Sequence, residues 1–250
     1  MKIRTGSAVR DGGFSLTELM VTMFIMGIVV AATVSLTIGF QRTNASNISR
    51  QEQIDTARFA VEAISKSVRT AVKPVQLSSA AASADDAFLQ GSDFSVQFYA
   101  NINNPGNNVG PSRVTYSLVT TGPTAGQIVE TVQTPDHSTV LLGASGYTYC
   151  PATSASATAE CKSHFSTRPV AFGALAVAGS PVFKYYDVEG RMLPGATGSL
   201  TVPDLGRVLS IEIVVSVQSK NATNAAPTTY VQRVTLPNAQ AVIREGKVTP

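Results

Sequence analysis

The 250-residue sequence predicts an α+β fold in which a long N-terminal helix lies under a mainly antiparallel β-sheet head. Three observations support this prediction. Residues 19–40 contain no charged side chain, apolar residues recur every three or four positions from Ile54 to Val72, and alternating β-type patterns follow Phe94. Helices and strands that occupy separate parts of a chain are typical of α+β domains.

The first predicted element is an apolar helix. Residues 19–40 would extend about 33 Å as a helix, which is enough to cross the hydrocarbon core of a bilayer. Lys2, Arg4 and Arg10 precede this run, and basic residues tend to stay on the cytoplasmic side of a membrane. An ordinary secretory signal has an apolar region of only about 7–15 residues. We therefore expect a single-pass helix in the inner membrane, with the rest of the chain outside the cytoplasm.

Glu18 is an acidic side chain at the start of this apolar run. A charged side chain costs about 2.5–3.5 kcal/mol at the centre of a bilayer, and less near its surface. No basic residue occurs between Phe14 and Gln41, so the helix itself offers no partner for the carboxylate. The sequence therefore indicates that a partner for Glu18 comes from outside the helix.

Residues 13–18 read Gly-Phe-Ser-Leu-Thr-Glu, between a basic leader and the uncharged run. This arrangement resembles the class III signal of type IV pilins and type II secretion pseudopilins. The resemblance implies that a prepilin peptidase cuts after Gly13 and methylates the new amino terminus at Phe14. It also implies that Glu18 meets the Phe14 amine of a neighbouring subunit in a fibre. Two charges that are costly in lipid would then attract each other strongly, and Glu18 would set the register of assembly rather than catalyse a reaction.

The resemblance implies a chain of four parts. They are a leader peptide at residues 1–13, a transmembrane and fibre-core helix at 14–44, an amphipathic helix of the head at 45–73, and a β-rich globular head at 74–250. The amphipathic segment carries an apolar stripe on one face and charged residues on the others, and we expect it to end at Lys73, before Pro74.

Strands are predicted in the remainder of the chain. Residues 75–93 and 101–112 are rich in small, Asn, Gly and Pro residues and are predicted as loops. The predicted strands cover the alternating residues 94–98, a hairpin of 113–120 and 127–134, shorter segments at 139–143 and 181–187, and a C-terminal pair at 207–219 and 230–237.

Cys150 and Cys161 lie in a stretch rich in Ser, Ala and Thr. Two thiols do not make a zinc site without other ligands, and His164 is the one histidine close to them in the sequence. In an exported chain the simpler interpretation is a disulfide, which would stabilise the fold by about 2–3 kcal/mol. A metal or redox role is the alternative.

The sequence contains no nucleophile motif, phosphate-binding loop or cluster of metal ligands. We expect His137 and His164 at the surface, and we expect residues 187–190 to form a solvated turn, because they supply fewer oxygen ligands than calcium requires. Lys162, His164 and Arg168 are predicted to form a solvated basic cluster. These patterns predict no cofactor, no metal and no enzymatic activity.

Part of the C-terminal half also shows a resemblance. Residues 183–193, the strand that starts at Arg207 and residues 231–238 resemble the layout of larger minor pilins and J-type pseudopilins. Many major pilins carry a helix-breaking proline in the apolar helix, and residues 14–44 contain none. The resemblance therefore implies a minor or priming subunit. Its partners would be prepilin peptidase, other pilins or pseudopilins, the inner-membrane assembly platform, and membrane lipid before assembly.

Two other functions stay open. The net charge of +3 falls to +1 for a chain that starts at Phe14, which leaves little attraction for nucleic acid without excluding it. A pilus-tip binding module for adhesion or DNA uptake would require an exposed aromatic or basic patch on the head. An anchored periplasmic enzyme would require a deep pocket with converging titratable groups.

Overall fold

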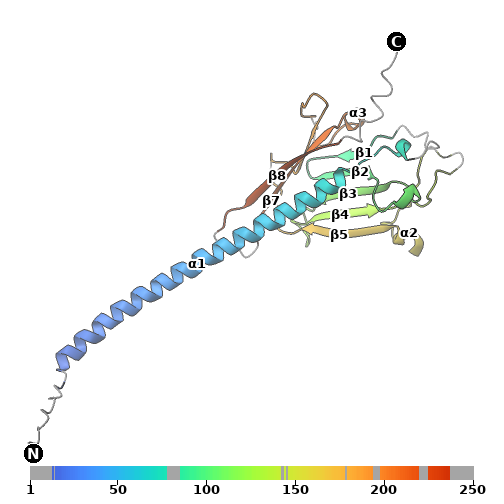
Figure 1. The fold of residues 1–250 in the computed structure, drawn as a ribbon. Coiled ribbons are helices and arrows are strands. Elements are labelled where there is room, and N and C mark those ends of the chain that lie inside the picture. The colour runs from blue at the N-terminus through green and yellow to red at the C-terminus, as the bar shows by residue number, and fades with distance from the viewer. Residues whose placement is uncertain are drawn as a thin grey trace, which may run out of the picture. The chain divides into compact units, whose positions relative to one another are not determined.

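The structure, a computed structural model, describes Gly13 and residues 15–77, 85–141, 144, 146–177, 179–193, 198–219 and 225–236. The chain divides into two compact units, Met1–Ile48 and Ser49–Pro250. Helix α1 (Leu16–Val68) contributes its first part to the first unit and its last part to the second. A long N-terminal helix followed by antiparallel sheets confirms the predicted α+β class (Figure 1).

In the first unit, α1 carries no charged side chain between Leu19 and Phe40 and exposes apolar side chains on all sides there. Its large apolar side chains, from Leu16 to Phe40, are all exposed within the chain. An 18-residue window of the helix has a mean hydropathy of 2.4, and α1 is the one helix in the described ranges that is long and apolar enough to span a bilayer. Side chains exposed on every face of such a helix require an apolar environment from outside the chain.

Hydroxyl groups in this part of α1 are satisfied within the helix. Thr33, Ser35, Thr37 and Thr43 each donate to the backbone carbonyl four residues earlier, and Thr22 donates to the carbonyl of Leu19. A hydroxyl that already has an acceptor can enter a lipid environment without a large desolvation penalty.

In the second unit, one face of α1 is buried. Ala57, Val61, Ile64 and Val68 are fully buried, as the predicted apolar stripe requires. The helix ends at Val68, however, and the predicted end at Lys73 is wrong. The reason is that the chain after Val68 joins a sheet: Ala71 forms a bridge with Ala100.

The first sheet of the second unit has five strands, which are antiparallel and follow the order of the chain. They are β1 (Phe88–Gly91), β2 (Ser95–Ala100), β3 (Ser112–Leu118), β4 (Ile128–Gln133) and β5 (Phe165–Ala171). The predicted hairpin around residues 121–126 is confirmed, because Leu118 on β3 pairs with Ile128 on β4. Alternate residues of β3 are buried, so one face of this sheet lies against the core.

The second sheet has three antiparallel strands, β6 (Phe183–Tyr186), β7 (Ser210–Val217) and β8 (Thr228–Thr235). It confirms the predicted C-terminal pair, with Val217 opposite Thr228. Tyr185 on β6 links the two sheets, because its hydroxyl lies 3.0 Å from the carbonyl oxygen of Ser92 and 3.1 Å from that of Ser95.

One hydrophobic core joins α1 to both sheets. Its largest members include Ile64 from the helix, Phe98 and Tyr116 from the first sheet, and Phe183 and Ile211 from the second. The last part of α1 is therefore an integral element of the second unit.

Several elements differ from the prediction. The expected loop at residues 75–93 contains the 3-10 helix η1 (Pro74–Gln76) as well as β1, and the loop at 101–112 contains η2 (Pro105–Asn107). The short helices α2 (Ala159–Ser163) and α3 (Val202–Leu205) and the strand β5 were not predicted. The strand predicted at 139–143 is wrong for residues 139–141, which are not in a strand, while Leu142 and Gly143 lie outside the described residues.

Candidate functional site

The predicted N-terminal site lies where α1 begins. Gly13 is exposed and precedes the helix, Glu18 is in the first turn, and Phe14 lies outside the described residues. Ser15 caps the helix, because its hydroxyl accepts a hydrogen bond from the backbone N–H of Glu18 at 3.2 Å. An acidic side chain in the first turn is also stabilised by the helix dipole.

The cap leaves the Glu18 side chain available for other interactions. The hydroxyl of Ser15 already satisfies the Glu18 N–H, so the carboxylate is not needed for local capping. Among the residues that the structure describes, the carboxylate forms no ion pair. Within those residues, the start of the apolar helix thus presents an acidic group without an opposite charge.

The two cysteines form a disulfide with a Cα–Cα distance of 5.9 Å. Cys161 lies in α2, and its N–H donates to the hydroxyl of Thr158. On the other side, the N–H of Cys150 donates to Asp136 and its carbonyl accepts from the side chain of Gln133 at the end of β4. The disulfide therefore holds the long β4–β5 connection close to the end of β4.

Arg113 reinforces this connection from the sheet. Its guanidinium lies 3.9 Å from the ring centroid of Tyr149 and 5.7 Å from that of Tyr99. The hydroxyl of Tyr149 donates to the carbonyl of Pro111 at 2.6 Å, and burial raises the pKa of Tyr149. This stack was not predicted, since Arg113 and Tyr149 are distant in sequence and belong to no motif.

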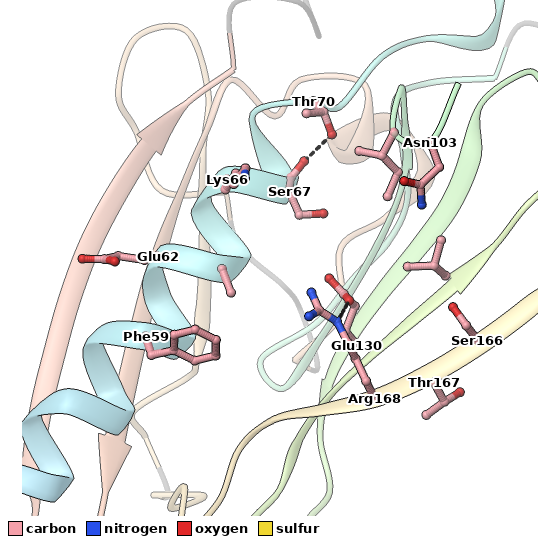
Figure 2. A pocket seen from close by; sticks show the side chains of 13 residues that line it. Phe59, Glu62, Lys66, Ser67, Thr70, Asn103, Glu130, Ser166, Thr167 and Arg168 are labelled. Carbon is pink, nitrogen blue, oxygen red and sulfur yellow. Dashed lines mark hydrogen bonds and ion pairs between the residues drawn. The ribbon is translucent and has the colours of Figure 1, made fainter. Parts of the chain in front are cut away.

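A cavity of about 660 Å³ lies between α1 and strands β4 and β5 (Figure 2). Phe59 from the helix and the side chains of Glu130 and Arg168 face each other across it. The Glu130 side chain is almost fully buried, and its carboxylate accepts hydrogen bonds from the Tyr116 hydroxyl and from Nε of Arg168.

These contacts set the protonation state of Glu130. Burial raises the pKa of its carboxyl, but the hydrogen bonds from Arg168 and Tyr116 together lower it by more, so that the net pKa lies below the ordinary value. The carboxylate is therefore charged at neutral pH and is paired with Arg168. The sequence contained a signal for this pair, because Glu130 occupies the same strand face as the buried Ile128 and an inward acidic residue requires a partner.

Arg168 is exposed, as predicted for the basic cluster, but it also forms an ion pair with Glu130 that the prediction did not include. Lys162 is exposed, as predicted. His137 is exposed, whereas His164 is half-buried, with Nδ1 lying 3.1 Å from both the Thr134 hydroxyl and the Pro135 carbonyl. The Nδ1 contacts show that His164 has a local structural role at the end of α2.

The turn predicted at residues 187–190 forms, and residues 188–190 are exposed, but the prediction of a solvated side chain is wrong for Asp187. Asp187 is only 3% exposed, and its carboxylate accepts hydrogen bonds from the backbone of Glu189 and Arg191 and from the side chains of Arg191 and Arg207. Burial raises the pKa of Asp187, but the bonds from Arg191 lower it more. The carboxylate thus holds the turn together. In the described part of the chain, no group of three His, Cys, Asp or Glu residues could hold a metal ion.

Residues 9–34 match the family model of the prokaryotic N-terminal methylation motif. No curated protein matches the chain significantly. The matched segment contains Gly13, Phe14, Glu18 and the first part of the apolar helix. The chain therefore carries a class III signal of the kind found in type IV pilins and pseudopilins, and this signal supports a subunit of that type. The resemblance of residues 183–238 to larger minor pilins has no such support.

Proposed function

We propose that this chain is a minor or priming structural subunit of a type IV pilus or a type II secretion pseudopilus. The observation that carries the proposal is the coincidence of the methylation motif at residues 9–34 with a helix that is apolar and exposed on all sides. Such a helix requires lipid before assembly and other helices afterwards.

In the proposed maturation, prepilin peptidase cuts after Gly13 and methylates Phe14. The position of Gly13 supports this step, because it is exposed and precedes the capped start of α1. The cut would create a positive amine about one helical turn from Glu18. The leader would be lost with its basic residues.

In the proposed assembly, Glu18 pairs with the Phe14 amine of a neighbouring pilin or pseudopilin. The lack of an ion pair for this carboxylate among the described residues supports the role, because a charge in an apolar fibre core is stabilised only when an opposite charge meets it. The assembly platform of the inner membrane would extract the helix from lipid. The head would lie outside the cytoplasm, where the Cys150–Cys161 disulfide is expected to persist.

The role is structural rather than enzymatic in this proposal. A minor subunit is favoured over a major one because residues 14–44 contain no proline that would kink the apolar helix. The buried acid of the cavity also serves the fold, because Glu130 accepts hydrogen bonds from Tyr116 and Arg168.

A second candidate is a binding module at the tip of a pilus. The cavity beside α1 favours this candidate, because its volume of 660 Å³ falls in the range of ligand sites. The charges that line it do not favour nucleic acid, since Glu62 and Glu130 balance Lys66 and Arg168. Titration of the full-length chain with labelled DNA and with labelled host glycans would test the two kinds of ligand.

The proposed function is tested by expressing the full-length chain in a bacterium that makes prepilin peptidase and its own pili. Mass spectrometry of the purified chain is expected to show loss of residues 1–13 and one methyl group on Phe14. Glu18→Val is expected to be processed normally but to disappear from the sheared filament fraction.

The matched control is Glu52→Val, which removes an exposed acid from the part of α1 that belongs to the second unit. This variant should be processed and incorporated like the unmodified chain. A chain that keeps residues 1–13 while the host's own prepilins are processed would contradict the proposal. Normal incorporation of Glu18→Val would contradict the assembly role of Glu18.

A further inference from the structure

We propose that the free edge of β5 and the cavity beside it bind an extended segment of a partner polypeptide by strand addition. One apolar side chain of that segment would enter the cavity. This inference goes beyond the proposed assembly role, which depends on the first unit, and it assigns a partner-binding surface to the second.

The outward backbone groups of β5 follow from its pairing with β4. Directly before β5, the N–H of Thr134 donates to the carbonyl of His164 at 2.9 Å, so these two residues form a hydrogen-bonded pair. Hydrogen-bonded and non-hydrogen-bonded pairs alternate along an antiparallel ladder. Phe165, Thr167 and Pro169 are therefore at non-hydrogen-bonded positions, and their backbone polar groups point away from β4.

Pro169 agrees with this assignment, because proline has no N–H and is tolerated where that group would face away from the ladder. The outer edge of β5 thus offers two donors, from Phe165 and Thr167, and three carbonyl acceptors. Residues 166–169 are all exposed, and no backbone group in the described ranges pairs with this outer edge. Proline limits the length of the added strand, so we expect a short pairing of about three to five residues.

The opposite edge of the same sheet is already covered. Beside β1, Ser92 forms a bridge with Ser199, and the N–H of Leu200 donates to the carbonyl of Gly91 at 2.7 Å. Within the described part of the chain, the five-stranded sheet therefore has one edge paired by its own chain and one edge open for addition.

The cavity lies on one face of this open edge. Ser166 and Arg168 extend from β5 towards the cavity, whereas Thr167 extends from the other side of the strand (Figure 2). Residues of an added strand that lie opposite Ser166 and Arg168 would share their face, because side chains directly opposite each other point the same way. Every second side chain of the partner would thus be directed towards the cavity.

The cavity favours an apolar side chain at that position. Apolar groups of Phe59, Ala63, Ile102 and Val132 line it, and Phe59 is 60% exposed although it belongs to a helix packed on a core. The Glu130–Arg168 pair at the β-sheet side is mutually neutralised. We therefore expect a partner segment that is extended, carries no net charge and has one large apolar residue between small polar residues.

The experiment uses the full-length chain in detergent micelles and three fluorescein-labelled seven-residue peptides. Each peptide alternates threonine and serine around a central valine, leucine or phenylalanine, and both ends are blocked. Fluorescence anisotropy is expected to show saturable binding of at least one peptide. The same peptide with N-methyl groups on alternate backbone nitrogens, which cannot pair with β5, should not bind.

Thr167→Pro removes an outward donor from β5 but no hydrogen bond of the β4–β5 ladder, so it is the sharpest variant. Phe59→Ser removes the apolar wall of the cavity. Each of these two single variants is expected to weaken peptide binding by roughly tenfold. The matched control is Val231→Pro, which by the same alternation removes an outward donor from the edge strand β8. Val231→Pro should leave peptide binding unchanged.

Hydrogen exchange keeps the proposal testable if a variant fails to fold. Addition of the peptide to the unmodified chain should slow exchange at the amides of Phe165 and Thr167. The proposal is overturned by the absence of saturable binding for all three peptides, by equal binding of the N-methylated peptide, or by unchanged exchange at these two amides. None of these outcomes bears on processing at Gly13 or on the assembly role of Glu18.

Discussion

The two units of the chain share helix α1 but differ in how far they bury its apolar side chains. In the first unit, residues such as Ile28 are 56% exposed in the chain by itself. In the second unit, Ile64 of the same helix is fully buried against two sheets. The first unit is therefore incomplete without lipid or other helices, whereas the second completes its own core.

The acidic side chains of the two units show the same contrast. Glu18 has no ion pair among the described residues, whereas Glu130 and Asp187 each receive hydrogen bonds from at least two residues. A buried acid with its donors in the same unit stabilises the fold. An acid without them at the start of an apolar helix is the basis of the pairing that we propose between subunits.

The largest expected effect is on processing of the first unit. Gly13→Val is expected to abolish cleavage, because a branched side chain would occupy the space that the peptidase requires at the cut. Intact mass spectrometry of the purified chain would show the leader retained. Gly12→Val is the matched control and should be processed, since it changes the adjacent glycine and leaves the predicted cut unchanged. Normal cleavage of Gly13→Val would place the cut elsewhere.

The second prediction compares one substitution in the two parts of α1. Ile64→Ala should lower the free energy of unfolding of the second unit by about 2–5 kcal/mol, because it leaves a cavity in the core. Ile28→Ala should change it by less than about 0.5 kcal/mol, because that side chain packs on nothing within the chain. Urea unfolding of the full-length chain in detergent measures both. Similar losses for the two variants would show that the units are not independent.

A smaller effect is expected from opening the disulfide. The double variant Cys150→Ala, Cys161→Ala should lower the free energy of unfolding of the second unit by about 2–3 kcal/mol, since the β4–β5 connection would gain freedom in the unfolded chain. Thermal unfolding with and without reductant measures this loss. The reductant should not change the unfolding temperature of the double variant. A change in that temperature would show that the reductant acts on something other than this disulfide.

The smallest effect is expected from Glu130→Gln, which removes the charge but keeps an acceptor for Tyr116. We expect a loss of about 1–2 kcal/mol at pH 7. The pKa of Glu130 is lowered in the folded state, so its contribution is complete above the ordinary glutamate pKa of about 4.3 and is lost as the pH falls through the folded value.

Urea unfolding at several pH values would measure this dependence. The unmodified chain should lose more stability than Glu130→Gln as the pH decreases from about 5 to 3. Glu52→Gln, at an exposed position, should follow the unmodified chain. Identical pH dependence for the Glu130 variant and the unmodified chain would contradict the buried ion pair.

Features with a strong local pattern could be predicted from the sequence. The apolar helix, the buried stripe at Ala57, Val61 and Ile64, and the hairpin of β3 and β4 each follow from the spacing of apolar residues. The disulfide followed from the number of cysteines and the exported context. For the helix, the stripe and the hairpin, the signal lies in residues that are close together in the sequence.

Features that depend on distant contacts could not be predicted. The sequence of β5, with a proline and four exposed residues, lacks a strand pattern because the strand lies at an edge. Helix α1 ends early because Ala71 pairs with Ala100, which is a tertiary contact. Asp187 was expected in solvent because its turn is polar, yet Arg207 and Arg191 come together around it only in the folded head.

The internally satisfied hydroxyls of α1 have a mechanical consequence for a fibre. Between Leu19 and Phe40, the helix presents mainly apolar groups to its surroundings, while the hydroxyls of Thr33, Ser35 and Thr37 are bonded to their own backbone. Dispersion contacts of this kind are individually weak and involve no hydrogen bond, so no single contact between two such helices is strong. In the fibre proposed above, the positions of such helices along the fibre axis would therefore be fixed mainly by the charges at their ends.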